Sequence, residues 1–289
     1  MTLLDGKELA DKIKAEIAGE VAARIDRGEK TPHLAAILVG EDPASQTYVS
    51  SKEKSSREVG MTSSVYRYPS NISEKALLDA VDFLNRDEEV DGFIVQLPLP
   101  PHINEQKVIE RFDPTKDIDG FHPVNLGRMM LGLPCFLPAT PMGIVTLLDR
   151  YKVETGGKHC VVLGRSHIVG TPISILLSRK ASPGNCTVTL CHSFTKEIAN
   201  YTREADILIV AMGKLHFVKA GMVKKDAVVI DVGVHRIPDE SKKSGFRLAG
   251  DVDFDKIANS CSYITPVPGG VGPMTIVSLL QNTLKAAKK

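Results

Sequence analysis

Tyr48 and Lys52 lie four residues apart in a segment that is predicted to form a helix, so their side chains share one helix face. A tyrosine ring can stack on a flat heterocycle, and a partly desolvated lysine can transfer protons or polarise a carbonyl or a water. Such a pair on its own is more often a solvated helix face. The chemistry becomes specific only with further groups beside it.

Two other sequence features favour ligand contact. Gln96 directly follows a short apolar strand predicted at 92–95, and open α/β sheets bind ligands at the carboxyl ends of their strands. Asp117 and Asp119 lie in a turn, where Asp117 is expected to cap the turn and Asp119 to accept hydrogen bonds from an amino-substituted heterocycle. The alternative for Gln96 is a loop amide satisfied by the backbone.

Residues 265–275 carry far more Pro and Gly than a connector needs. Glycines there would let the backbone approach a ligand closely, and Pro273 suits the first position of the last helix. We therefore include this loop among the candidate ligand contacts.

The strongest general signal is a strand, a tight turn and a helix. The apolar run Cys160–Leu163 ends at Gly164, and Gly170 opens a predicted helix. In that geometry, backbone N–H groups and a helix N-terminus bind a pyrophosphate. The spacing Gly-x-Ser-x-x-x-Gly departs from the common Gly-x-Gly-x-x-Gly pattern, so an ordinary strand–turn–helix is the alternative.

The type of dinucleotide is indicated by the next strand. A site for NAD usually ends that strand with an acid that binds the ribose diol. Here the strand 187–191 is followed by 192–195 (His-Ser-Phe-Thr) without an acid, and Arg165 lies in the first turn. A cation and a hydroxyl favour a 2′-phosphate, which predicts NADP unless Arg165 is only a solvated charge. The nicotinamide half is expected near 231–234.

These candidates need a scaffold, and the hydrophobic pattern indicates one in which helices and strands alternate. Strands are predicted at 33–39, 63–68, 92–95, 159–163, 187–191, 207–211 and 227–231, and helices at 6–27, 43–60, 73–86, 143–151, 173–179, 198–204 and 276–287. The stretch 112–141, rich in Pro, Gly and Asp, is predicted to form functional loops. This alternation indicates an α/β fold with largely parallel sheets.

Composition excludes several classes of protein. The 289 residues are 43% hydrophobic and 25% charged, with a net charge of +1, which excludes a disordered tail or a coiled-coil rod and gives no bulk attraction to nucleic acid. The apolar runs are far shorter than the ~20 residues of a membrane span. Five scattered cysteines without metal-binding spacing predict reduced thiols in a cytoplasmic protein, and no metal site.

Five segments together resemble one enzyme family, in order and over nearly the whole chain. They are Tyr48–Lys52, Gln96–Pro100, Lys116–His122, Gly164–Gly170 and Pro266–Thr275. The chain resembles the short bacterial form of the bifunctional methylenetetrahydrofolate dehydrogenase/methenyltetrahydrofolate cyclohydrolase family. That family oxidises 5,10-methylenetetrahydrofolate to the 5,10-methenyl cation with NADP and then hydrolyses the cation to 10-formyltetrahydrofolate.

The resemblance implies two α/β domains. A folate-binding catalytic domain would comprise residues 1–140 plus 270–289, and a Rossmann-like NADP-binding domain would comprise residues 141–269. The C-terminal helix would return to the first domain, and the protein would be a homodimer.

The resemblance also implies a role for each site residue. Lys52 would assist water attack and proton transfer in the hydrolysis, and Gln96 would hydrogen-bond Lys52. Tyr48 would stack against the folate, and Asp119 would bind and orient the pterin ring. The remaining folate contacts would be Val95, Leu97, Pro268, Gly272 and Pro273. The NADP contacts would be Gly164, Arg165, Ser166, Ser193 and Val234.

Two other functions fit parts of the chain. A shikimate-type dehydrogenase would share the NADP domain and act on a small hydroxy or keto acid, but no arginine clamp accompanies Lys52 and Gln96. A folate- or nucleotide-binding protein without catalysis would have no use for Lys52 and Asp119 together. Turnover of methylenetetrahydrofolate separates all three.

Overall fold

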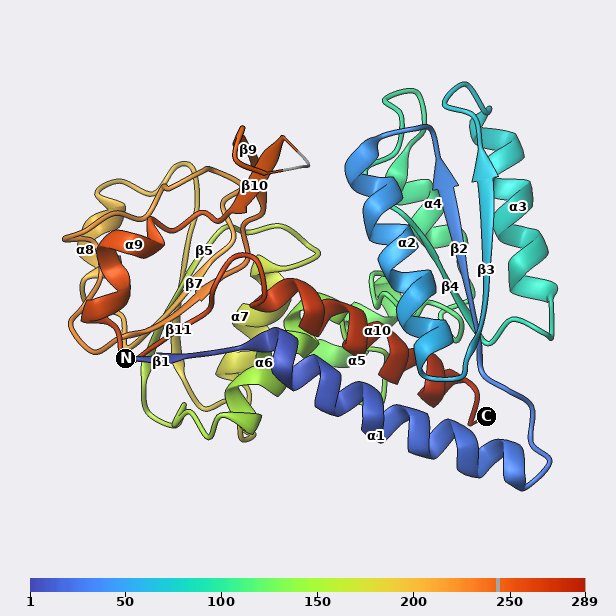
Figure 1. Cartoon of the computed structure of the whole chain (residues 1–289), viewed down its shortest axis with the longest axis horizontal. Coiled ribbons are helices and arrows are strands. Elements are labelled where there is room, and N and C mark those ends of the chain that lie inside the picture. The colour runs from blue at the N-terminus through green and yellow to red at the C-terminus, as the bar shows by residue number, and fades with distance from the viewer. Residues whose placement is uncertain (243–244, 289) are drawn as a thin grey trace. The chain divides into compact units, whose positions relative to one another are not determined.

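The computed structural model describes residues 1–242 and 245–288, and the chain forms two compact units, each built from two stretches of chain (Figure 1). Unit 1 comprises Met1–Ala10 and Thr140–Thr275, and unit 2 comprises Asp11–Ala139 and the chain from Ile276 onward. The α/β fold with parallel sheets is confirmed. The functional domain bounds drawn from the sequence stay a prediction, and the compact units assign residues 1–10 and 270–275 to the same unit as the middle of the chain.

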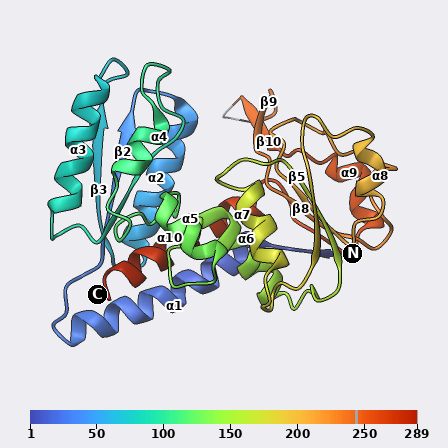
Figure 2. The same cartoon turned by 180° about the vertical axis from the view of Figure 1, so that it is seen from behind.

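Unit 2 is built on a three-stranded parallel sheet in the order β3-β2-β4. Its strands are β2 (His33–Val39), β3 (Thr62–Tyr68) and β4 (Gly92–Val95). Helices α2 (Pro43–Glu58) and α3 (Glu74–Arg86) flank this sheet in both views of the chain (Figures 1 and 2). The sheet therefore points the carboxyl ends of its strands in one direction, as a ligand-binding edge requires.

The core of unit 2 follows from the spacing of apolar residues on α3. Leu77, Val81 and Leu84 recur at helical intervals, are buried, and pack in one cluster with the strands. In the same cluster the rings of Phe93 and Phe112 are stacked with their centroids 4.3 Å apart. This packing fixes β4, the strand that leads into the first candidate site.

Unit 1 is built on a parallel sheet in the order β1-β11-β8-β7-β5-β6. Its strands are β1 (Thr2–Leu3), β5 (His159–Leu163), β6 (Thr187–Cys191), β7 (Ile207–Val210), β8 (Val228–Asp231) and β11 (Tyr263–Ile264). The other elements of this part of the chain are α6 (Ala139–Arg150), α7 (Gly170–Ser178), α8 (Ile198–Thr202), the antiparallel hairpin β9 (His235–Pro238) and β10 (Phe246–Ala249), α9 (Phe254–Ile257) and a 3₁₀ turn (Ala258–Ser260). Because β6 and β7 lie on opposite sides of β5, the strand order reverses beside β5, where such folds bind dinucleotides.

Several elements differ from the sequence prediction, among them three helices. The stretch 112–141, predicted as loops, contains α5 (Pro123–Met130), whose first turn is capped by the His122 ring accepting the Val124 N–H at 3.1 Å. Helix α4 (Glu105–Arg111) was not predicted. The last helix, α10 (Val271–Ala286), begins five residues earlier than expected, so Pro273 occupies its third position. Pro273 still lies in the first turn, where a helix tolerates the missing N–H.

Helices α1 (Gly6–Asp26) and α10 each contribute residues to both units. Within unit 2, Asn282 of α10 is buried and its Nδ2 donates to the carbonyls of Ile118 (2.8 Å) and Leu137 (3.0 Å). The expected return of the C-terminal helix to the first domain is thus confirmed.

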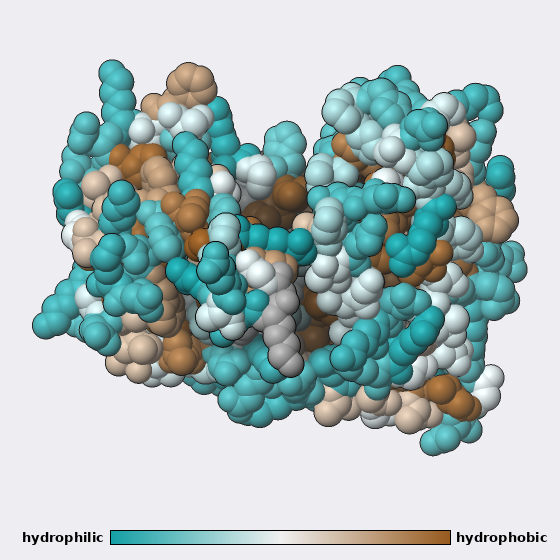
Figure 3. Space-filling model, turned by 45° about the horizontal axis from the view of Figure 1, so that its top comes forward, coloured by the Kyte–Doolittle hydropathy of each residue, from teal (hydrophilic) through white to brown (hydrophobic). Residues whose placement is uncertain are grey.

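Hydrophilic residues cover most of the face shown in Figure 3, and apolar residues reach it only in small patches. Within the described ranges, no helix is long and apolar enough to span a bilayer.

Candidate functional site

Helix α2 presents Tyr48 and Lys52 one turn apart. The helix begins after Asp42, whose carboxylate accepts the N–H of Ser45 at 2.7 Å, and Pro43 takes the first position, where no N–H is needed. Lys52 is only 7% exposed, whereas Tyr48 is 39% exposed. The lysine is therefore enclosed by protein atoms, while the tyrosine ring retains surface for a ligand.

Gln96 meets Lys52 at the carboxyl end of β4. The N–H of Gln96 donates to the carbonyl of Ile37 at 2.9 Å, which extends the sheet ladder by one residue. Its Nε2 donates to the carbonyl of Leu97 (2.7 Å), and this bond turns Oε1 toward Lys52, whose Nζ donates to it at 3.2 Å. The nitrogen of Gln96 thus binds backbone, and its oxygen binds the lysine as the family resemblance implies. A contact between Gln96 and a ligand stays a prediction.

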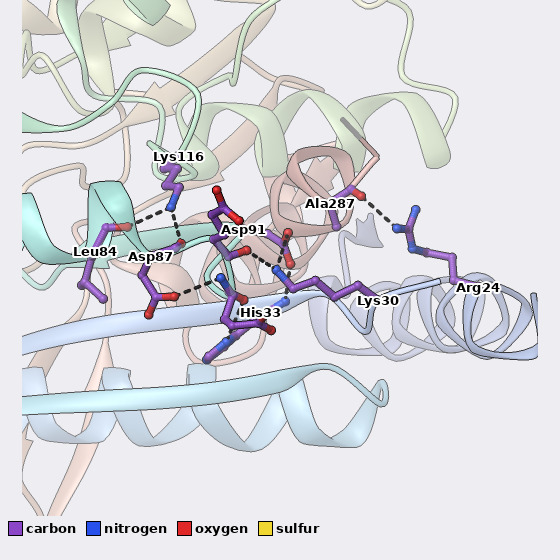
Figure 4. A network of polar contacts seen from close by, with 10 residues as sticks. Arg24, Lys30, His33, Leu84, Asp87, Asp91, Lys116 and Ala287 are labelled. Carbon is purple, nitrogen blue, oxygen red and sulfur yellow. Dashed lines mark hydrogen bonds and ion pairs between the residues drawn. The ribbon is translucent and has the colours of Figure 1, made fainter. Parts of the chain in front are cut away.

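A lysine anchors the start of the segment that carries the candidate acids. Figure 4 shows Lys116, whose Nζ donates to the carbonyls of Leu84 (2.9 Å) and Asp87 (2.5 Å) at the end of α3. The ammonium thus binds carbonyls at and just beyond the end of the helix, where partners within the helix are missing. Burial lowers the pKa of Lys116. The segment that follows Lys116 is thereby fixed to the body of unit 2.

The same segment runs parallel to β4. The N–H of Phe93 donates to the carbonyl of Lys116 at 3.0 Å, and Phe93 forms a parallel bridge with Asp117. The chain turns directly after this bridge, where the N–H of Gly120 donates to the carbonyl of Asp117 at 3.2 Å. Asp119 lies in that turn and lines one small cavity together with Val95, so it lies near the end of β4 from which Gln96 emerges.

Asp117 braces the turn. It is buried, and its carboxylate accepts the side-chain amide of Asn125 (2.9 Å) and the N–H groups of Gly120, Phe121 and His122. Burial raises the pKa of Asp117, and these hydrogen bonds oppose the rise. The predicted capping role of Asp117 is confirmed.

Asp119 differs from Asp117 in its partners. Its side chain is half-buried, and among the residues that the structure describes no donor binds its carboxylate. Burial raises the pKa of Asp119, the positive charge of Lys52 opposes the rise, and the negative charge of Asp117 adds to it. The site thus offers an ammonium, an amide and a carboxylate with acceptor capacity left for a ligand.

Two of the expected folate contacts lie beside this cluster. Val95 is nearly buried and Leu97 is half-buried, and both line a cavity of about 20 Å³ together with Asp119 and Phe121. That volume suits one water and is far too small for a bicyclic ring. Val95 and Leu97 therefore border a space for about one water here, and a folate contact of either residue stays a prediction.

In unit 1 the turn after β5 is closed to side chains. Gly164 has φ +109°, and a Cβ there would overlap the carbonyl of Ala211, while a Cβ on Gly170 would overlap the carbonyl of Gly164. The hydroxyl of Ser166 accepts the N–H groups of Val169 (3.2 Å) and Gly170 (3.4 Å), which orders the start of α7. The backbone can therefore approach a ligand closely at this turn, as a pyrophosphate site requires.

Arg165 extends from that turn toward the residues that follow β6. Its guanidinium carbon lies 6.0 Å from the ring centroid of Phe194, which is 81% exposed, and Ser193 beside it is also exposed. No acid occurs among residues 192–195. A cation and a hydroxyl thus gather at the place where the second strand of a Rossmann fold contacts the adenosine ribose.

Val234 is 45% exposed, just beyond the end of β8. A fully buried charge at the same edge, Asp251, was not predicted, because Gly250-Asp251 follows a short hairpin and carries no recognisable motif.

The remaining expected contacts, Pro268, Gly272 and Pro273, belong to unit 1, and the peptide bond before Pro268 is cis. The site residues thus form one group in each unit: Lys52, Gln96 and Asp119 in unit 2, and the turn after β5 with Arg165 in unit 1. In the described part of the chain, no three metal-binding side chains gather at one point.

Two family models match the chain. Residues 4–119 match the tetrahydrofolate dehydrogenase/cyclohydrolase catalytic domain, and residues 138–289 match the NAD(P)-binding domain of the same family. Together they cover most of the sequence. Their order along the chain agrees with the order of the two groups of site residues.

Curated and solved relatives match over the full length. The bifunctional protein FolD of Bacteroides fragilis is 61% identical, over 100% of this chain and 99% of its own. The crystal structure of the bifunctional dehydrogenase/cyclohydrolase FolD of Campylobacter jejuni superposes with a TM-score of 0.93 at 47% identity, covering 100% of this chain and 99% of that one. The FolD structure of Trypanosoma brucei, complexed with NADP cofactor and inhibitor, has a TM-score of 0.93 at 39% identity, covering 98% of this chain and 96% of that one.

Proposed function

Because the chain belongs to the tetrahydrofolate dehydrogenase/cyclohydrolase family, we propose that the cluster of Lys52, Gln96 and Asp119 carries its hydrolytic chemistry. The protein oxidises 5,10-methylenetetrahydrofolate to the 5,10-methenyl cation with NADP and hydrolyses that cation to 10-formyltetrahydrofolate. The observation that carries the proposal is the hydrogen bond from Lys52 Nζ to Gln96 Oε1 at the ligand-binding edge of β4. Folate chemistry is favoured over that of a small hydroxy acid by family membership.

The oxidation requires that the two reacting carbons be positioned in contact, and it requires no acid or base. N5 and N10 of the folate stabilise the positive charge that develops when hydride leaves the carbon between them, so contact between the reacting carbons is most of the catalysis. NADP, when bound, supplies the hydride acceptor. We assign its contacts to Gly164, Arg165, Ser166, Ser193 and Val234, and the side-chain-free turn at Gly164 supports a close backbone approach.

The hydrolysis requires proton transfer. Water adds through its oxygen to the bridging carbon, and both of its protons leave that oxygen as the formyl C=O forms. One proton reaches N5 as the carbon–N5 bond breaks, and the other is released to solvent. Lys52 is the group assigned to this transfer, because its Nζ is enclosed and held by Gln96. Gln96 is a positioning residue that orients the ammonium.

The folate ring is assigned to the same cluster, beside the exposed part of Tyr48. Asp119 has acceptor capacity for the amino and ring N–H groups of a pterin, and the exposed face of Tyr48 can stack on the ring. Val95 and Leu97 of unit 2, and Pro268, Gly272 and Pro273 of unit 1, stay proposed folate contacts on the strength of the family resemblance.

Replacing Lys52 by Met tests the assignment. The variant should lose cyclohydrolase activity by about 100-fold or more, the range of a positioned proton-transfer group, while NADP-dependent hydride transfer persists. The methenyl chromophore should therefore accumulate, as followed by its absorbance after addition of NADP and methylenetetrahydrofolate. Lys54→Met is the matched control, because Lys54 lies on the same helix with a side chain 79% exposed. Normal hydrolysis in Lys52→Met would remove Lys52 from the mechanism.

Two further properties are proposed from the family resemblance. The protein is assigned as a homodimer, which sedimentation velocity of the full chain tests directly. It is assigned to the cytoplasm, and five free cysteines support a reducing compartment. The functional domain bounds also stay a proposal: a folate-binding domain at 1–140 plus 270–289 and an NADP-binding domain at 141–269. Titrating site variants of each domain with folate and with NADP separately tests which domain binds which ligand.

A further inference from the structure

Two buried carboxylates lie at the cofactor edge of unit 1 and have no part in the mechanism above. Asp231 is the last residue of β8, and Asp251 follows β10. Asp251 is 0% exposed and Asp231 is 3% exposed. Buried carboxylates are costly unless donors satisfy them, so their partners indicate what they stabilise.

Asp251 binds the loops that follow two neighbouring strands. Its Oδ2 accepts the N–H groups of Met212 (2.7 Å) and Gly213 (2.8 Å), and its Oδ1 accepts the N–H of Lys214 (2.8 Å). Those three donors follow β7. The fourth donor is His235 Nε2, 2.7 Å from Oδ1, in the segment that follows β8. One carboxylate therefore joins the ends of both strands.

Asp231 in turn fixes the backbone that carries Asp251. Its Oδ1 accepts the N–H groups of Gly233 (2.9 Å) and Asp251 (3.0 Å), and its Oδ2 accepts the N–H of Val252 (2.9 Å). Space is equally restricted, since a Cβ on Gly233 would overlap the Asp251 carboxylate and one on Gly250 would overlap that of Asp231. The arrangement leaves little freedom for either carboxylate to move.

These loops are the ones expected to face the dinucleotide. Gly164 packs on the carbonyl of Ala211, so the loop after β7 directly supports the turn after β5. Val234 lies between Gly233 and His235, both of which meet Asp251. The N–H groups of 212–214 already donate to Asp251, so we assign the pyrophosphate contacts to the 165–170 segment.

We propose that Asp251, bridged to His235 and held by Asp231, is a positioning residue that sets the affinity of the protein for NADP by ordering the loops at 211–214 and 232–235. This inference rests on the proposed cofactor site. It assigns no contact between Asp251 and the cofactor, because the carboxylate is fully buried and its donors occupy both oxygens. Asp251 changes the affinity for NADP only by fixing the conformation of these two loops.

A pair of substitutions at His235 tests the bridge with little risk to folding, because Asp251 keeps its three backbone donors. His235→Leu removes the donor, whereas His235→Gln retains a side-chain N–H at similar reach. Calorimetric titration of the full chain with NADP should show a dissociation constant raised about tenfold in His235→Leu and restored to within about threefold of wild type in His235→Gln. Cyclohydrolase activity on added methenyltetrahydrofolate, measured without NADP, should stay unchanged in both.

Asp251→Asn is the stronger variant. It should weaken NADP binding more than His235→Leu and accelerate hydrogen exchange at the amides of Met212, Gly213 and Lys214. The inference is overturned if His235→Leu binds NADP as wild type does, if Gln fails to rescue Leu, or if NADP binding and cyclohydrolase activity fall together. A wild-type protein that bound no NADP would instead refute the proposed cofactor site itself, so the two failures are distinguishable.

Discussion

Lys52 and Arg165 are both cations, yet their surroundings suit them to different tasks. Lys52 is enclosed and its ammonium is aimed at one amide oxygen, an arrangement in which a proton can be held and moved. Arg165 is exposed on a turn beside an aromatic ring, and its planar, permanently charged guanidinium suits recognition of a phosphate. Exchanging the two residue types would impair both sites.

At the residue scale, Arg165→Ala should separate NADP from NAD. Loss of the guanidinium should raise the Michaelis constant for NADP about tenfold or more, because one charge-assisted contact to the 2′-phosphate disappears. The constant for NAD should change little. Initial rates with each dinucleotide provide the measurement. Lys225→Ala is the control. This exposed lysine precedes β8 and so lies toward the amino ends of the parallel strands, whereas Arg165 follows the carboxyl end of β5. An equal effect on both dinucleotides would refute the 2′-phosphate assignment.

At the scale of elements, the segment that carries Asp119 is held by the ends of two helices. Lys116 binds the carbonyls of Leu84 and Asp87 at the end of α3, and Asp117 binds the N–H groups that lead into α5. These two contacts fix both ends of the segment that carries Asp119. The Pro, Gly and Asp residues that suggested loops from 112 to 141 thus belong to a short ordered connection and to a capped helix, α5.

Strand β8 makes stability depend on pH. Burial raises the pKa of Asp231, its last residue, from 3.8 to about 6. The native state therefore holds this proton more tightly than the unfolded state, and the contribution of Asp231 to the free energy of unfolding falls as pH rises from about 4 to about 6. The expected loss is up to about 3 kcal/mol, with no further change above that window.

Asp231→Asn isolates this contribution. Urea unfolding of wild type and variant at several pH values between 4 and 7 gives the difference in their unfolding free energies. That difference should shift by up to about 3 kcal/mol across the window, in the direction of lower wild-type stability at the higher pH. A difference independent of pH would mean that Asp231 titrates as an ordinary carboxyl.

At the scale of the whole molecule, neither unit is formed by one continuous stretch of chain. Unit 2 needs the residues from Ile276 onward, and unit 1 needs the first ten residues, whose strand β1 pairs with β11. Both stretches at the ends of the sequence therefore belong to folded units, and their contacts contribute to the stability of those units.

Asn282→Ala tests this closure. The substitution leaves the carbonyls of Ile118 and Leu137 without their side-chain donor, and buried unsatisfied acceptors cost about 1–3 kcal/mol each. We expect a loss of about 2–4 kcal/mol in the stability of unit 2, together with a raised Michaelis constant for folate, because Ile118 precedes Asp119. Thermal unfolding and initial rates check both effects. Wild-type stability in the variant would show that α10 is held by its apolar face alone.

The sequence by itself determined the local elements and their chemistry. The spacing of Tyr48 and Lys52, the strand that ends before Gln96 and the turn from Gly164 to Gly170 are all readable because helix and strand periods repeat over a few residues. The same local information predicted an α/β fold and the absence of an acid after β6. It did not predict α4 and α5, because these helices are short, are bounded by turn residues and are stabilised by distant contacts.

Only the tertiary structure decided which distant groups meet. The bond from Lys52 to Gln96, the cavity that Val95 and Asp119 share, and the closure of two loops onto Asp251 join residues 44, 24 and up to 39 positions apart. No local pattern encodes such pairings, because they arise from the packing of whole strands and helices. The sequence thus determined which side chains were available, and packing determined which of them form a site.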